Sequence, residues 1–490
     1  MNDVAAAPSG PMMTAYAAAR AAAPGATVLY RVGEFYEVLF DDAERVSKAL
    51  GIQLTRRRQK DSDDIPMCGI PASSVTGVVS RLLAAGFKVA LSQQPLEPSG
   101  DRPLQLMTAA TSVDPDILAA GRPNNLTVVL AQEQSVGFAW IDVSTGEAGT
   151  CWASLEACGP AIARIGPSEI LVARWPDASV GLAVAIRSAG TKFADLARPE
   201  LSSREADALL VKTYGEGFRG AFQGFSPVEL AAFAALLDYI FATIGRLPDR
   251  LPPPRHWATG DTMEIDAPTL RGLEVLDSPS GLQGALLSVL DRTVTPAGAR
   301  LLVQQLSAPL TKPDIIRRRL AMVGFLVAAP SVRGNCREDL SGMPDLQRAC
   351  GRLSIGKGGP RDLAVIRDGL VRAAGAAGQL KGQPALPPGL ATAAREMAIA
   401  SEGQCGELAA SLRRAPPPPI SINETEFVAD GYAQRLDTSR RRAAEVRVAI
   451  QDLKQPSEHG EGNRQRNLAP MRRTTRFGLA QAAASCEQSD

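Results

Sequence analysis

The pattern of apolar residues changes once along this chain, and that change limits what the chain can fold into. Before about residue 250, runs in which apolar and polar residues alternate are interleaved with runs of helical spacing, which is typical of α/β modules. After Met263, apolar residues recur three and four positions apart, as in residues 285–306 and 314–328. With 490 residues the chain is long enough for several hydrophobic cores. The pattern therefore predicts a multidomain fold, α/β plus all-α.

Shifts in composition suggest where these domains begin and end. A first mixed α/β module is predicted over residues 1–115, because a stretch rich in Pro, Gly and charge at residues 96–102 precedes a second α/β pattern. The second module is predicted over residues 116–250, and a mostly helical region over residues 251–455. Residues 456–490 lose periodicity and are polar, so we expect a disordered tail there.

The charged, histidine and cysteine residues argue against several classes of site. Lysine plus arginine number 53 and aspartate plus glutamate 52, so any contact with DNA has to be local. The 7 cysteines are scattered without a CxxC pair and are expected to be reduced thiols. The 2 histidines are far apart in sequence, which leaves little material for a Ser-His-Asp site. We predict no catalytic residue and no metal ligand.

The N-terminus and the lengths of the apolar runs predict a cytoplasmic protein. The first residues contain Asp3 and lack the basic flank of a signal peptide. Apolar runs elsewhere are interrupted by charge, Pro or Gly before they reach the roughly 18 residues that a transmembrane helix needs. No transmembrane helix and no membrane partner are expected.

One segment of the first module carries the most informative pattern. Residues 30–43 read Tyr-Arg-Val-Gly-Glu-Phe-Tyr-Glu-Val-Leu-Phe-Asp-Asp-Ala, within a strand that Gly33 interrupts. Phe35 and Glu37 form a Phe-x-Glu pattern, which by itself is weak. The alternative interpretation is that Phe35 is an ordinary strand aromatic and Glu37 a solvated edge residue.

In its wider context this segment resembles the signature of the MutS family of DNA mismatch repair proteins, in which a strand delivers a Phe-x-Glu motif to DNA. The resemblance covers roughly residues 10–454 in order. Further matching segments are Pro11–Met13, Leu54–Arg57, Ile65–Pro71, Asp142–Glu147, Met263–Asp266 and Leu287–Gly298.

The resemblance implies a mismatch-recognition domain over residues 1–115 and a ribonuclease H-like α/β connector over residues 116–250. It also implies a helical core over residues 251–455 that ends in the first lever helix. Family members continue through a DNA clamp, a returning lever helix and an ATPase domain, for which the sequence shows no complete P-loop or acidic Walker B strand. A C-terminally truncated member with a truncated lever is expected, and residues 456–490 are either a frameshifted tail or the end of a natural short form.

In the family frame, Phe35 is a wedge and Glu37 an acceptor for the displaced base. Unstacking a base step costs a few kcal/mol on paired duplex and less where pairing is faulty, so a mismatch is the favourable place to insert a ring. Arg56, Arg57 and Arg58 form the densest basic cluster of the first module and would contact the DNA backbone. The alternative, of equal weight, is that these three arginines lie in a solvated loop, because acidic residues follow them immediately.

A second motif, Gly351–Gly358, matches GxxxxGK but ends in glycine where a P-loop needs Ser or Thr to hold magnesium. Residues 343–352 before it have helical rather than strand spacing. We therefore expect no phosphate-binding role for this motif.

These expectations combine into one function with an alternative. The chain is expected to bind mismatched double-stranded DNA, without enzyme activity and without a cofactor of its own, although the full-length family uses ATP and magnesium. The family forms a homodimer, which would be weakened here, and a MutL-type repair partner would bind through the connector. The alternative is a truncated interaction module that binds repair partners without useful DNA affinity, or a gene remnant.

Overall fold

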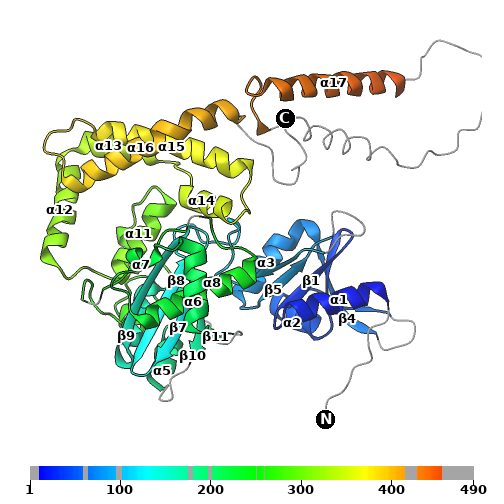
Figure 1. Cartoon of the computed structure of the whole chain (residues 1–490), viewed down its shortest axis with the longest axis horizontal. Coiled ribbons are helices and arrows are strands. Elements are labelled where there is room, and N and C mark those ends of the chain that lie inside the picture. The colour runs from blue at the N-terminus through cyan, green and yellow to red at the C-terminus, as the bar shows by residue number, and fades with distance from the viewer. Residues whose placement is uncertain are drawn as a thin grey trace, which may run out of the picture. The chain divides into compact units, whose positions relative to one another are not determined.

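The computed structural model describes residues 10–58, 64–94, 102–174, 180–191, 193–196, 201–249, 251–258, 260–413 and 427–454. The chain divides into two compact units, Met1–Ala429 and Asp430–Asp490. The first unit contains two sheets followed by helices (Figure 1). The N-terminal α/β part and the helical region that follows it therefore agree with the predicted order of fold classes. The expected tail at residues 456–490 lies outside the described residues.

The first sheet has six strands in the order β3-β4-β2-β1-β5-β6. Only β1 and β5 run parallel, and each other neighbouring pair is antiparallel. The strands are β1 Thr27–Val32, β2 Phe35–Leu39, β3 Thr55–Arg57, β4 Ile65–Pro71, β5 Val89–Ser92 and β6 Leu104–Met107. The helices are α1 Pro11–Ala22, α2 Asp41–Leu50 and α3 Val75–Ala84, with a 3-10 turn, η1, at Ala72–Ser74.

Both faces of this sheet are covered, each by its own core. On one face Tyr16 of α1 packs with Tyr30, Leu39 and Ile65. On the other face α2 and α3 cover a second cluster that includes Tyr36, Val38, Cys68, Ile70 and Leu82. Because side chains alternate along β2, its odd-numbered residues face α1 and its even-numbered residues face α2 and α3.

The second sheet also has six strands, in the order β11-β10-β7-β8-β9-β12. β7, β8 and β9 form an antiparallel meander, and β10 then pairs parallel to β7, β11 parallel to β10 and β12 parallel to β9. The strands are β7 Asn125–Gln132, β8 Ser135–Asp142, β9 Glu147–Ser154, β10 Pro167–Arg174, β11 Phe193–Asp195 and β12 Arg255–His256. The helices are α4 Cys158–Ile165, α5 Val180–Ser188, α6 Ser203–Tyr214, α7 Phe218–Ala221 and α8 Pro227–Ile244, with the 3-10 turn η2 at Leu155–Ala157.

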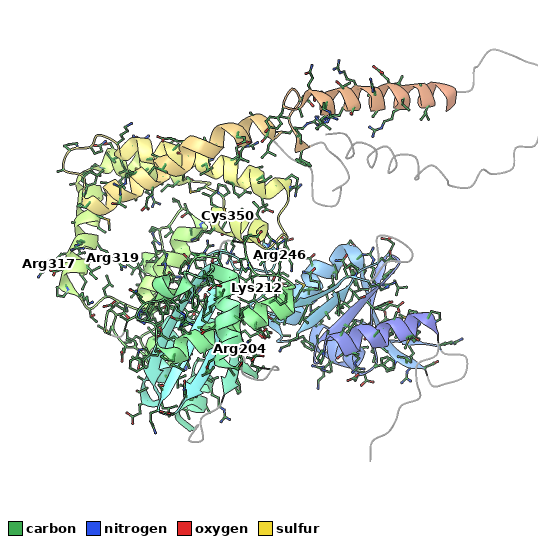
Figure 2. The ribbon with its side chains drawn as sticks, in the orientation of Figure 1. Arg204, Lys212, Arg246, Arg317, Arg319 and Cys350 are labelled. Atoms are coloured by element: carbon green, nitrogen blue, oxygen red, sulfur yellow. The ribbon has the colours of Figure 1, made fainter. Side chains whose placement is uncertain are left out.

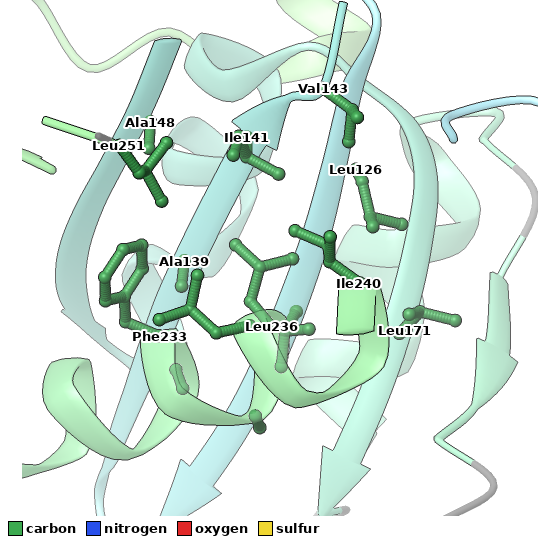
Figure 3. Packing of buried hydrophobic residues seen from close by; sticks show 14 of the residues in the cluster. Leu126, Ala139, Ile141, Val143, Ala148, Leu171, Phe233, Leu236, Ile240 and Leu251 are labelled. Atoms are coloured by element: carbon green, nitrogen blue, oxygen red, sulfur yellow. The ribbon is translucent and has the colours of Figure 1, made fainter. Parts of the chain in front are cut away.

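Helix α8 forms the centre of this domain's core, where Phe233, Leu236 and Ile240 lie against Leu126 and Ile141 of the sheet (Figure 3). Among the described helices it is also the one long and apolar enough to cross a membrane by length and composition. The sequence analysis expected no such segment, because it counted every charge as an interruption. Burial against the sheet is the arrangement of a core helix and accounts for the apolar composition of α8.

Beyond residue 263 the described chain in the first unit is helical: α9 Ala267–Gly272, α10 Leu286–Leu290, α11 Pro296–Ser307, α12 Pro313–Ala328, α13 Pro330–Leu340, α14 Leu346–Ser354, α15 Pro360–Leu380 and α16 Pro388–Ser411. The second unit contains α17, Gln434–Lys454. Residues 285–306 form two helices rather than one, because Asp291 accepts hydrogen bonds from both the backbone and the hydroxyl of Thr293. The Thr295 hydroxyl then caps α11 by accepting from the Gly298 amide at 3.0 Å.

The first half of the GxxxxGK motif, Gly351–Ser354, lies in α14, as the helical spacing of the preceding residues predicts, and the rest of the motif follows the end of that helix. Gly351 is within α14 and no described strand leads into it. A Cβ at Gly351 would meet the Ser144 carbonyl oxygen at 2.0 Å, so the backbone of α14 lies directly against the turn between β8 and β9. Glycine is required here for close packing between a helix and the second sheet.

Candidate nucleic-acid interface

A two-residue turn presents Phe35 at the end of the β1–β2 hairpin. Gly33 in this turn has φ 55°, a left-handed conformation that glycine adopts without strain, and Val32 pairs with Phe35 across the strands. Phe35 is 51% exposed, whereas its neighbour Tyr36 is 3% exposed. The ring is therefore free to contact another molecule, while the next residue anchors the strand in the core.

Glu37 lies two residues further along the same face of β2, and its nearest charged neighbour is Arg57. The Arg57 Nη1 donates a hydrogen bond to the Glu37 Oε2. The side chains are 35% and 14% exposed, so this ion pair is only partly solvated. The β4 residue between the two strands at the level of Glu37 is Gly69, which carries no side chain. The predicted acceptor and one of the predicted backbone contacts are thus joined to each other.

Arg56 and Arg58 differ from Arg57 in their surroundings. Arg56 pairs with Pro66 in the β3–β4 ladder and, by alternation, faces the opposite side of the sheet from Arg57. Both Arg56 and Arg58 are exposed, and within the described part of the chain neither makes an ion pair. The three predicted arginines therefore do not form one continuous basic surface.

Arg102 adds a cation that the sequence analysis did not select. Its guanidinium carbon lies 4.2 Å from the centroid of the Tyr30 ring, and its Nη1 donates to the Arg31 carbonyl oxygen at 2.9 Å. Tyr30 is the cross-strand partner of Glu37, so Arg102 flanks the same region of the sheet. A single arginine in a Pro- and Gly-rich connection gives no periodic signal, and only the fold brings it onto the Tyr30 ring.

Buried polar residues fix the base of this hairpin. The Tyr16 hydroxyl accepts a hydrogen bond from the Leu39 amide at the end of β2, at 3.2 Å, and burial raises the pKa of Tyr16 to about 12. Asp42 at the start of α2 accepts from Arg45 at 3.0 Å and from the Thr27 hydroxyl at 3.4 Å. Burial is also the main cause that raises the pKa of Asp42. These contacts tie β1, β2 and α2 together below the exposed ring.

Exposed cations occur elsewhere too, so charge alone does not define an interface. Exposed Arg204 and Lys212 lie on α6, and exposed Arg317 lies on α12 (Figure 2). Among the described residues no group of His, Cys, Asp and Glu could hold a metal ion, and the described cysteines are free thiols. In the first domain an exposed aromatic ring, Phe35, lies on the same strand as Glu37, a carboxylate that is paired with Arg57.

Comparison with known families matches three consecutive parts of the chain. MutS domain I matches residues 10–113, which include Phe35, Glu37 and Arg56–Arg58. MutS domain II matches residues 124–253 and MutS domain III residues 268–461.

Curated relatives that carry the name DNA mismatch repair protein MutS are similar over most of the chain. The protein from Rhodopseudomonas palustris strain HaA2 is 38% identical over 459 residues, which is 90% of this chain and 50% of the relative. The protein from Cereibacter sphaeroides strain ATCC 17025 is 36% identical over 90% of this chain and 51% of the relative. The protein from Nitrobacter winogradskyi is 36% identical with the same two shares, 90% and 51%. The chain spans about half the length of the curated relatives it matches.

Proposed function

Because the chain belongs to the MutS family of DNA mismatch repair proteins, we propose that it binds mismatched double-stranded DNA through its first domain. In this proposal the Phe35 ring enters the minor groove at a mispair and Glu37 contacts the displaced base. The observation that carries the proposal is that Phe35 is 51% exposed at the end of a hairpin, while the next residue, Tyr36, is 3% exposed and holds the strand in the core.

Discrimination in this proposal comes from the cost of opening the duplex. A ring that enters the minor groove has to unstack a base step, which costs about a few kcal/mol on paired duplex and less at a mispair. The hydrogen bonds that fix the base of the hairpin support this role. A ring on a mobile hairpin would be displaced by the DNA, and the base step would stay stacked. Readout is then indirect: it measures how readily the duplex kinks rather than which bases are present.

Arg57 has a different role from the one that its position in a basic cluster suggests. As the hydrogen-bond donor to Glu37, it holds the carboxylate in one orientation and offsets its charge near phosphates. Arg56 and Arg58, which are exposed, supply contacts to the DNA backbone without sequence preference. Arg102, beside Tyr30, is a further candidate for such a contact.

The domains and partners proposed next rest on the same membership of the MutS family. We propose a mismatch-recognition domain over residues 1–115, a connector over residues 116–250 and a helical core with the first lever helix over residues 251–455. The antiparallel meander β7–β8–β9, followed by the parallel strands β10 and β11, supports a ribonuclease H-like connector. A homodimer, a MutL-type partner at the connector and a cytoplasmic location also remain proposals.

We further propose that the three domains of this chain neither bind nor hydrolyse ATP. In support, the GxxxxGK motif ends in glycine, and its Gly351 lies within α14 against the second sheet. The ATP and magnesium that the full-length family uses would then be bound by parts outside these domains.

The proposal is tested by gel-shift titration of the purified chain with a G·T duplex and a matched G·C duplex. The unmodified chain is expected to prefer the G·T duplex, and Phe35→Ala is expected to bring the ratio of the two affinities close to one. The matched control is Phe241→Ala, which removes another exposed aromatic ring, from α8 of the second domain. A G·T preference that survives Phe35→Ala would show that the wedge assignment is wrong.

A specific observation favours the alternative, an interaction module. No residue of α12 is buried, and Leu320, Val323 and Val327 are 61%, 57% and 64% exposed. Apolar side chains exposed along one helix are typical of a surface that another polypeptide covers. If the chain binds neither duplex in the titration, the interaction module becomes the better account.

A further inference from the structure

The outer edge of β9 is paired over only part of its length. Arg255 and His256 of β12 pair with Gly149 and Thr150, and the Trp257 amide donates to the Thr150 carbonyl at 2.9 Å. After Trp257 the chain leaves β9. Thr262 forms a bridge with Leu310 instead, and the Met263 amide donates to the Pro309 carbonyl at 2.7 Å. Over the described residues, Cys151–Ser154 therefore pair with β8 alone.

A pocket of about 260 Å³ lies at this unpaired edge. Strand residues 151–154 form one wall, α4 contributes Pro160 and Arg164, and the segment that diverges from β9 contributes Trp257 and Met263. Pockets that hold drug-sized ligands have volumes of roughly 300–1,000 Å³. This pocket is smaller, so it fits a side chain of a peptide better than a nucleotide or another large cofactor.

Arg164 is the cation of the pocket; it is partly buried, and no acid among the described residues is hydrogen-bonded to it. Its guanidinium carbon lies 4.0 Å from the centroid of the Trp257 ring, whose own position is fixed by Trp140 at a centroid distance of 4.1 Å. Burial lowers the pKa of Arg164. Of the residues that the structure describes, none forms an ion pair or hydrogen bond with this guanidinium.

The acidic groups near Arg164 act on it through space: the charges of Asp261 and Glu264 raise its pKa, although burial has the larger effect, and neither acid forms a hydrogen bond with it. Asp261 forms an ion pair with Lys312. Burial raises the pKa of the Cys151 thiol to about 12, so that thiol is neutral. Glu264 is exposed at the rim of the pocket, where its negative charge would repel a carboxylate that binds there. A half-buried cation without a hydrogen-bonded acid is costly, and a carboxylate from another molecule would recover that cost.

We propose that this pocket is a docking site for an extended peptide segment of a partner protein. The segment adds to the edge of β9 at Cys151–Ser154, places an apolar side chain over Trp257 and directs a carboxylate to Arg164. An open strand edge supplies backbone hydrogen bonds, and a pocket beside it supplies selectivity for side chains. The site is separate from the hairpin that carries Phe35, so this proposal does not depend on DNA binding.

The test uses the full chain and a library of random linear peptides, with counter-selection against the Arg164→Gln chain. Selected peptides are then synthesised, and their affinities are measured by fluorescence polarisation. We expect the selected peptides to share a carboxylate next to an apolar residue. Arg164→Gln should weaken their binding roughly tenfold, the value of about one charge-assisted hydrogen bond.

Two further variants separate docking from a structural role of Arg164. Glu264→Gln removes the opposing charge at an exposed position and should strengthen binding of the acidic peptides by a few fold. Arg187→Gln removes an exposed cation of α5 in the same domain and should leave binding unchanged. If no peptide is enriched over the Arg164→Gln chain, or if Glu264→Gln weakens binding, the docking site is refuted.

Discussion

Arg57 shows how the surroundings of a residue change the role that its type suggests. In the sequence it belongs to a run of three arginines, and such runs contact DNA backbones through charge. In the fold it donates to Glu37, twenty positions away in sequence, because β3 and β2 both pair with β4. Its neighbour Arg56 faces the other side of the sheet.

Substitutions at these two arginines should therefore have different effects. Arg56→Gln removes the backbone contact proposed for Arg56, so it should weaken G·T and G·C binding equally and reduce the slope of log affinity against log salt by about 1. Arg57→Gln leaves the carboxylate without its cation, so it should lower the ratio of G·T to G·C affinity by a few fold, about 1 kcal/mol. Salt titrations on both duplexes measure both quantities. Identical behaviour of the two variants would contradict the role given to Arg57.

How far the sequence predicts the site is clearest at this scale. Residues 30–43 predicted which strand carries Phe35 and Glu37, because glycine and the alternation of apolar residues are local signals. The pairing of Glu37 with Arg57 and the approach of Arg102 to Tyr30 depend on strand order, which one sequence does not encode locally. The roles of Phe35, Glu37 and Arg56–Arg58 at DNA stay predictions.

At the level of elements, the β1–β2 hairpin depends on one backbone conformation. Gly33 has φ 55°, and an L-residue with a side chain pays about 1–2 kcal/mol there. The sequence analysis placed residues 30–43 within one strand that Gly33 interrupts, and in the structure the chain turns back at Gly33 to form the hairpin of β1 and β2. Likewise residues 285–306 became two helices, because Asp291 and Thr295 form local hydrogen bonds that compete with a continuous helix.

Gly33→Ala should therefore loosen the hairpin. We expect amide hydrogen exchange in β1 and β2 to accelerate roughly tenfold, as measured by mass spectrometry of peptides from this region. The matched control is Gly77→Ala in α3, where glycine has a helical conformation and an added Cβ meets nothing within 4 Å. That variant should slow local exchange, because alanine stabilises a helix interior by about 0.5–1 kcal/mol. Equal effects of the two substitutions would argue against strain at Gly33.

At the level of the whole molecule, Arg300 of α11 links the helical region to the segment that leads into the second sheet. Its side chain is 5% exposed and donates to both oxygens of Asp345, at 2.6 and 2.9 Å, and to the Ala120 carbonyl at 3.0 Å. Burial by itself would raise the pKa of Asp345, but the hydrogen bonds and charge of Arg300 outweigh it and hold that pKa below its usual value. No sequence pattern joins residues so far apart.

Arg300→Gln should destabilise this junction by about 3 kcal/mol, because it removes the cation that donates to both oxygens of Asp345 and leaves only Arg348, whose Nε lies 3.9 Å from that carboxylate. The depressed pKa of Asp345 contributes stability above pH 4, and that contribution is lost as the pH falls below about 4. The Arg300→Gln chain should therefore lose less stability than the unmodified chain as the pH falls below about 4. Thermal unfolding followed by circular dichroism between pH 3 and 7 measures both effects. Arg317→Gln, which breaks an exposed pair with Asp314, should change stability by less than about 0.5 kcal/mol.

The contact at Gly351 also limits how these parts can move. Since even a methyl group there would overlap the Ser144 carbonyl, α14 cannot come nearer to the β8–β9 turn, and the bonds of Arg348 and Gln347 to Arg122 and Glu147 keep it from withdrawing. Contact on one side and hydrogen bonds on the other leave α14 no room to slide, so a push or a pull on either part is carried to its neighbour.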